Sequence, residues 1–224
     1  HLKPENVISF SSKSVPILAI LRKNLLDNKS TQINYTGELP HFFDAEVLQR
    51  IYGYKFDLKH VMNPSDISEF NGSTIFISQQ DEVGHSDINP NIDFVINLYT
   101  KLGSVLLVHG EQNESYVSEI QHVRRRETIA MTPANCLATL KALVEKSSLD
   151  TQNSNGETNK TLVLDSIKAI TGAPTKPLVG SSGLSIQYAI MMGLIHDALE
   201  NHKGKPIKFI VPPNCYGGTN DQAR

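Results

Sequence analysis

Apolar positions form short runs separated by polar turns along the chain, and these runs predict alternating strands and helices. Residues 73–78 are a β-branched run that predicts a buried strand, and residues 104–109 predict a second one. Between them, a helix is predicted to begin at Asn89 and to continue to Tyr99, and residues 114–126 have helical spacing. This order of strand, helix, strand and helix predicts a parallel sheet with right-handed crossovers.

The same spacing predicts further helices elsewhere. Residues 15–26 contain a proline near the first turn, where proline is tolerated, and residues 43–51 have helical spacing within the otherwise mixed segment 31–69. Residues 134–146 follow Thr132, a good N-cap residue. These helices add to the α/β character of the first two thirds of the chain.

Residues 147–160 are the most linker-like segment, because Leu149 is their only apolar residue and none of them is aromatic. The main boundary is therefore predicted there, between an N-terminal α/β region over residues 1–146 and a second region over residues 161–224. The second region is predicted to begin with a short helix over residues 162–170.

The last third of the chain is organised around a Gly/Ser turn over residues 180–184. A short apolar run over residues 177–179 predicts a strand before it, and residues 184–199 predict a long helix after it. Free N–H groups and the positive end of the dipole make such a helix start suitable for a phosphate. The alternative is that glycine only permits a tight turn between a strand and a helix.

A second small-residue loop, over residues 214–220, carries the aromatic side chain of Tyr216. It follows residues 207–211, which predict another buried strand. Ligands of open α/β sheets bind at the carboxyl ends of strands, so the two loops are predicted to meet at one sheet edge. A surface turn with the tyrosine packed on its neighbours is the alternative.

The last third of the chain contains, in order, a Ser-Ser-Gly-Leu turn, an apolar helix, a basic linker, a strand and a Tyr-Gly-Gly-Thr-Asn loop. This order resembles the Cys/Met-metabolism family of pyridoxal-phosphate-dependent enzymes, the cystathionine γ-synthase and γ-lyase group. Residues 164–173 are similar to the family's short helix before its Ser-Gly turn. The resemblance covers about residues 160–224. It implies that residues 161–224 begin a fold-type-I pyridoxal-phosphate transferase domain, with an accessory α/β region and a parallel sheet before it.

If the resemblance holds, the cofactor is pyridoxal 5'-phosphate. The backbones of Gly183 and Leu184, with the Ser182 hydroxyl beside them, would bind its phosphate, and Tyr216 would stack on its ring and assist proton transfer. The family catalyses β- or γ-elimination or γ-replacement on cysteine, cystathionine, methionine or an activated homoserine, and its members are homo-oligomers. The expected substrate is therefore a small amino acid.

Some family features are absent from the sequence. The family's Schiff-base lysine, and the aspartate that faces the pyridine nitrogen, lie downstream of the Tyr-Gly-Gly-Thr loop, and the sequence ends before both, at Arg224. It also begins at His1 rather than methionine, and it has Arg124–Arg126 rather than the family's Tyr-x-Arg motif. The sequence is therefore expected to be the N-terminal part of a longer protein and inactive alone.

Composition excludes some classes of partner. The chain is 39% hydrophobic and 20% charged, with a net charge of −2, so neither a nucleic acid nor a membrane is expected as partner. We find no targeting signal and no apolar run long enough to span a membrane. Two cysteines cannot form a disulfide framework, which favours the reducing cytoplasm.

Other candidate sites are weaker. Residues 180–184 nearly match the Gly-x-Ser-x-Gly elbow of hydrolases, but Leu184 replaces the last glycine. Cys215 is either a nucleophile or a small packed residue. The histidines lack metal-ligand spacing, so no metal is expected. The alternative function is a non-catalytic nucleotide- or protein-binding module built on residues 70–145.

Overall fold

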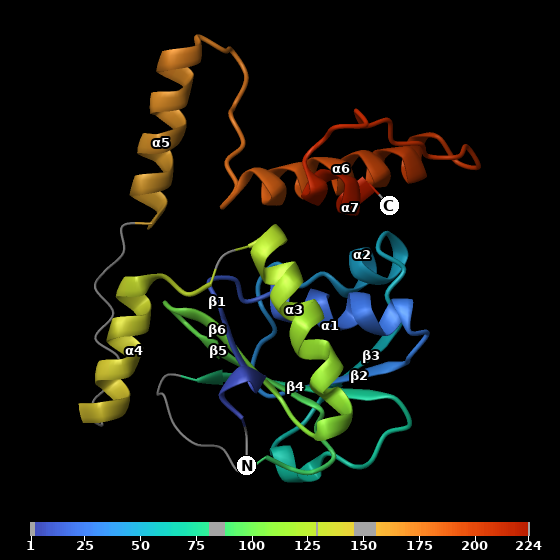
Figure 1. The fold of residues 1–224 in the computed structure, drawn as a ribbon, viewed down its shortest axis with the longest axis vertical. Helices are drawn as coiled ribbons and strands as arrows, with labels where there is room; N and C mark the ends of the chain where they lie inside the picture. Colours follow the sequence, from blue (N-terminus) through green and yellow to red (C-terminus); the bar gives the residue numbers. More distant parts are fainter. Residues whose placement is uncertain (1–2, 81–87, 129, 146–155, 224) are drawn as a thin grey trace. The chain divides into compact units, whose positions relative to one another are not determined.

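The structure is a computed structural model that describes residues 3–80, 88–128, 130–145 and 156–223 (Figure 1). It divides the chain into two compact units, His1–Asp150 and Thr151–Arg224. The described residues form a mixed α/β structure with one six-stranded, mostly parallel sheet and seven α-helices.

All strands of the described residues lie in the first unit, in the sheet order β1-β6-β5-β4-β2-β3. The pairs β2–β3, β2–β4 and β4–β5 are parallel, whereas β5–β6 and β1–β6 are antiparallel. The strands are β1 (Val7–Phe10), β2 (Thr31–Tyr35), β3 (Phe56–His60), β4 (Ser73–Gln80), β5 (Phe94–Tyr99) and β6 (Gly103–Val108).

Among the described residues, four helices belong to the first unit and three to the second. In the first unit they are α1 (Val15–Leu26), α2 (Ala45–Arg50), α3 (Glu114–Glu127) and α4 (Pro133–Glu145). In the second unit they are α5 (Gly156–Thr171), α6 (Gly183–Asn201) and α7 (Gly217–Ala223). The first unit also contains the 3₁₀ turns η1 (Pro4–Asn6), η2 (Pro64–Asp66) and η3 (Glu111–Asn113).

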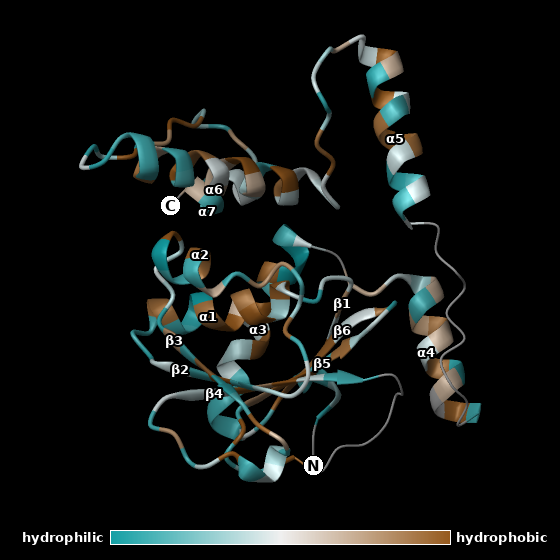
Figure 2. Cartoon of the chain, turned by 180° about the vertical axis from the view of Figure 1, so that it is seen from behind, coloured by the Kyte–Doolittle hydropathy of each residue, from teal (hydrophilic) through white to brown (hydrophobic). Residues whose placement is uncertain are grey.

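The sheet separates two hydrophobic clusters because alternate side chains of a strand point to opposite faces. On one face, α1 and α3 pack on each other, and their apolar residues join Ile75 and Ile96 in the main core. On the other face, Phe76 and Val95 form a second cluster with side chains of the connecting loops, namely Val61, Ile67 and Ile92. Figure 2 shows the apolar strands between these layers.

The strands predicted over residues 73–78 and 104–109 are confirmed as β4 and β6, and three predicted helices are confirmed as α1, α3 and α4. The helix predicted from Asn89 to Tyr99 is wrong, because its second half is the strand β5. All six residues of β5 are buried between β4 and β6, and so short an apolar run does not distinguish a buried strand from a helix.

Both strands predicted in the second unit are wrong, because residues 177–179 and 207–211 are irregular. A strand needs a neighbouring strand to pair its backbone groups, and the described residues of this unit contain none. The helix predicted over residues 162–170 is longer: α5 already begins at Gly156, inside the segment predicted as a linker. Residues 147–155 of that segment lie outside the described residues.

A buried polar chain joins α1, α3 and β2 in the first unit. The Tyr116 hydroxyl donates to Asn24 Oδ1, and Asn24 Nδ2 donates to Thr31 Oγ1 at 2.8 Å. Burial, with the nearby negative charges of Asp27 and Asp93, raises the pKa of Tyr116 to about 12 from its ordinary value of 10.0. The folded state therefore favours the neutral phenol.

We expect the first unit to lose about 2–3 kcal/mol of stability as the pH rises from about 10 to about 12, because Tyr116 ionises first in the unfolded chain. Urea unfolding at several alkaline pH values measures this loss. Burial also raises the pKa of Tyr52 and Tyr99, so the Tyr116→Phe variant should keep part of the pH dependence. A variant with the full wild-type slope would contradict the role of Tyr116.

Candidate functional site

The N-terminus of α6 is built by a reciprocal pair of serines. Ser182 has extended backbone angles, φ −155° and ψ 165°, and its Oγ accepts a hydrogen bond from the Ser185 N–H at 3.1 Å. In return, the Ser182 N–H donates to Ser185 Oγ at 2.9 Å. This capping box explains why the helix begins directly after Ser182.

Two backbone donors at this helix start are left over. The Ile186 N–H bonds to the Ser182 carbonyl oxygen at 3.1 Å, whereas the structure records no acceptor for the N–H groups of Gly183 and Leu184. A Cβ atom added to Gly183 would meet no atom within 4 Å, so this position is open. Among the described residues, the two N–H groups are therefore free to bind an outside acceptor.

The Tyr216 loop lies against the same helix start. Gly218 is buried, and a Cβ atom added to it would lie 2.6 Å from Leu184 Cδ1 and 3.0 Å from Tyr216 Cε1. The Tyr216 side chain itself is 72% exposed. The loop thus holds an accessible aromatic ring close to Leu184.

Three hydrogen bonds hold α7 on the first turns of α6. Thr219 Oγ1 donates to Gln187 Oε1 at 2.9 Å, and Gln187 Nε2 donates to Gln222 Oε1 at 2.9 Å. Gln222 Nε2 then donates to the Leu184 carbonyl oxygen at 3.1 Å. Sequence reasoning missed both glutamines, although Gln187 is a polar residue within an apolar helix, which could have indicated a specific contact.

The structure brings the predicted residues Ser182, Gly183, Leu184 and Tyr216 together within one unit. It does so through contact between two helices rather than through a shared sheet edge, as the sequence had predicted. Their roles toward a cofactor stay predictions.

The donor set suits a phosphate dianion. It offers two amide N–H groups, the positive end of a 19-residue helix and the Ser182 hydroxyl hydrogen, for which the structure records no acceptor. The exposed ring of Tyr216 adds a flat apolar surface beside them. These residues therefore fit the phosphate end of pyridoxal phosphate.

Other predicted candidates have structural roles here. Ser182 caps a helix, which is not how the serine of a hydrolase elbow is used. Arg124, in the last turn of α3, donates to the Ser9 carbonyl oxygen at 3.3 Å, as suits a cation at a helix C-terminus. Cys215 is half-buried.

No protein-family model matches the chain, and the comparison with curated proteins finds no match either. Within the described residues, no three or more His, Cys, Asp or Glu side chains are grouped so as to hold a metal ion. None of the helices described has the length and apolar character that crossing a membrane requires.

The Ser182→Ala variant is expected to weaken the start of α6 by about 1 kcal/mol, because it removes the cap acceptor of the Ser185 N–H. Amide hydrogen exchange at Ser185 should then be roughly fivefold faster. Ser181→Ala is the matched control, because Ser181 donates only to Ser185 Oγ and caps no backbone group. Equal exchange rates in the two variants would contradict the capping role.

Proposed function

We propose that the chain is the N-terminal part of a pyridoxal-phosphate-dependent enzyme of sulfur amino-acid metabolism, and that the start of α6 binds the cofactor's phosphate. The observation that carries this proposal is the pair of free N–H groups at Gly183 and Leu184, with the Tyr216 loop held against Leu184. The resemblance of residues 160–224 to the Cys/Met-metabolism family supports the same reading.

Each residue then has a definite role. The N–H groups of Gly183 and Leu184 donate to phosphate oxygens, and the Ser182 hydroxyl adds a third donor without leaving its capping position. Tyr216 packs its ring against the face of the cofactor's heterocycle, and its phenol oxygen can hold or pass a proton. When bound, pyridoxal phosphate supplies an electron sink for carbanions of amino acids.

The substrate class follows from the resemblance. It is a cysteine, cystathionine, methionine or activated homoserine, and the reaction is β- or γ-elimination or γ-replacement.

The proposed fold-type-I domain and homo-oligomer have further support in α6. No residue of this helix is buried in the structure, and apolar side chains such as Ile190 and Leu194 are exposed. A helix this apolar is normally covered by other parts of a protein.

The test compares pyridoxal phosphate with pyridoxal, which lacks the phosphate. The protein should bind pyridoxal phosphate at least about tenfold more tightly, as measured by cofactor absorbance and by hydrogen-exchange protection of the Tyr216 loop. Equal binding of the two compounds, or no binding of either, would overturn the proposal.

The variant Gly183→Pro removes one donor while keeping the helix, because proline is well tolerated at the first helical position and Ser182 already has the extended backbone that precedes proline. It should reduce the preference for the phosphorylated compound about tenfold. Gly183→Ala is the matched control: it keeps the N–H, and its Cβ meets no atom within 4 Å. If the proline variant binds like the alanine variant, the Gly183 N–H is not a phosphate ligand.

A further inference from the structure

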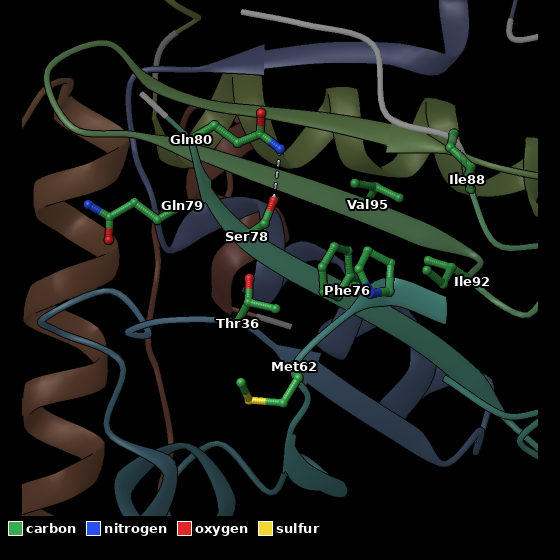
Figure 3. Close-up of a pocket in the computed structure, with 10 residues that line it drawn as sticks. Thr36, Met62, Phe76, Ser78, Gln79, Gln80, Ile88, Ile92 and Val95 are labelled. Carbon is green, nitrogen blue, oxygen red and sulfur yellow. Dashed lines mark hydrogen bonds between the residues drawn. The ribbon is translucent and has the colours of Figure 1, made fainter. Parts of the chain in front are cut away.

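The first unit contains a cavity of about 300 Å³ on the face of the sheet opposite α1 and α3 (Figure 3). This volume lies at the small end of the range of ligand pockets. The cavity is lined by Thr36, Met62, Pro64, Phe76, Ser78, Gln79, Gln80, Ile88, Ile92 and Val95. Neither the sequence pattern nor the proposed cofactor site accounts for it.

The cavity lies at the carboxyl ends of two parallel strands. Thr36 directly follows β2, and residues 78–80 end β4, which is paired with β2. From β2 the chain passes through α2, on the main-core face, to β3 on one side of the pair. From β4 it passes through Ile88 and Ile92, on the opposite face, to β5 on the other side. This reversal is the switch point at which open α/β sheets bind ligands.

The polar groups of the cavity are held in place by hydrogen bonds and still have unused hydrogen-bonding capacity. Ser78 Oγ donates to Asn97 Oδ1 at 2.9 Å, and Gln80 Nε2 donates to Ser78 Oγ at 3.3 Å and to Asn97 Oδ1 at 3.5 Å. Because these two oxygens lie only 2.9 Å apart, a single N–H of Gln80 can serve both of them. The structure records no donor for Gln80 Oε1 and no partner for the Thr36 hydroxyl among the described residues. The Gln80 amide can therefore offer an oxygen acceptor and a second N–H donor side by side.

A buried acceptor without a partner lies on the same face of the sheet. Asn34 is fully buried, its Oδ1 has no hydrogen-bond donor, and it stands beside Phe76 in the register of β2 and β4. Buried side-chain oxygens normally have a donor, so Asn34 Oδ1 is an unused acceptor on this face of the sheet. Asn34 is two residues before Thr36, which directly follows β2.

The lining selects an uncharged, flat ligand. None of the ten lining residues carries a charge, so nothing among them would hold a phosphate or a carboxylate. Phe76, Met62 and Ile92 offer apolar surface to a ring. A glutamine amide pairs with the adjacent donor and acceptor on the edge of an adenine ring.

We propose that this cavity binds an uncharged heterocycle with adjacent hydrogen-bond donor and acceptor, of the adenine nucleoside class, through the Gln80 amide, the Thr36 hydroxyl and the apolar wall around Phe76. The site is separate from the proposed cofactor site, which lies in the other unit. The phosphate-binding donors of α6 are not part of it.

Methyl-detected NMR of the full chain with added adenosine tests this site. Adenosine should shift the methyl signals of Met62, Ile88, Ile92 and Val95 in a saturable manner, whereas ribose should not. Adenosine monophosphate should bind no more tightly than adenosine. Absence of these shifts at millimolar adenosine would overturn the proposal, and clearly tighter binding of the monophosphate would overturn its uncharged class.

Two variants test the polar contacts. Gln80→Leu is expected to weaken adenosine binding about tenfold, and Thr36→Val about fivefold, because each leaves a ligand polar group unpaired. Thr36→Val should fold normally, since its hydroxyl has no recorded partner in the described structure. Thr161→Val, in α5 of the other unit, is the matched control. Wild-type affinity in both cavity variants would contradict the assignment.

Discussion

Replacing Gly103 by alanine is expected to lower the free energy of unfolding of the first unit by about 3 kcal/mol or more. Gly103 begins β6 with φ 111°, a region that L-residues rarely adopt. An added Cβ atom would fall on the carbonyl oxygen of Phe10 and lie 2.9 Å from Ser11 Cα. Both contacts are backbone atoms, so no side-chain rotation relieves them, and β1 must separate from β6.

The matched control for Gly103→Ala is Gly53→Ala, because Gly53 also has a positive φ, 71°, but no atom within 4 Å of its added Cβ. It should cost about 1 kcal/mol, from backbone strain alone. Urea unfolding followed by circular dichroism gives both values. If the two variants differ by less than about 1 kcal/mol, the close approach of β1 to Gly103 is not an essential contact.

β4 and β6, which the sequence predicted, have dense apolar patterns, whereas β2 and β3, which it missed, have weak ones. β4 has six consecutive buried residues, but β3 buries only Phe56, and β2 includes the buried Asn34. Their pairing is decided by neighbouring strands that are distant in sequence. A single-sequence pattern reports local burial and not that long-range pairing.

The sequence predicted which residues make up the candidate site, but it did not predict the elements that bring them together. The serine and glycine turn does begin a helix, because capping is a local property of residues 182–185. The strand expected beside it is absent, and the Tyr216 loop is instead held by Gln187 and Gln222. A hydrogen bond between side chains 35 positions apart leaves no periodic signal in a sequence.

The cavity of the first unit could not be predicted for the same reason. Thr36, Met62 and Gln80 follow or end three different parallel strands, and only the order of those strands in the sheet brings them together. The helix expected over β5 would have removed this arrangement. Because β2 and β3 were not predicted either, the sequence did not show the switch point.

The Gly218→Val variant is expected to separate the Tyr216 loop from α6 and, if the proposed function is right, to reduce pyridoxal phosphate affinity at least about tenfold. Gly218 is buried, and its added Cβ would lie 2.6 Å from Leu184 Cδ1, so a branched side chain cannot fit without displacing Leu184 or Tyr216. Overpacking of this kind costs about 1–3 kcal/mol. The hydrogen bonds of Gln187 to α7 should weaken with it.

Gly217→Val is the matched control for this variant, because it adds the same side chain at the neighbouring position, where a Cβ meets no atom within 4 Å. Hydrogen exchange of α7 measures the contact, and cofactor absorbance measures binding. If α7 of Gly218→Val exchanges faster but the variant binds the cofactor with unchanged affinity, the contact with Leu184 is confirmed and Tyr216 is not part of the cofactor site. Exchange equal to that of Gly217→Val would instead mean that α7 does not depend on Leu184, because a helix held by that contact cannot tolerate a valine within it.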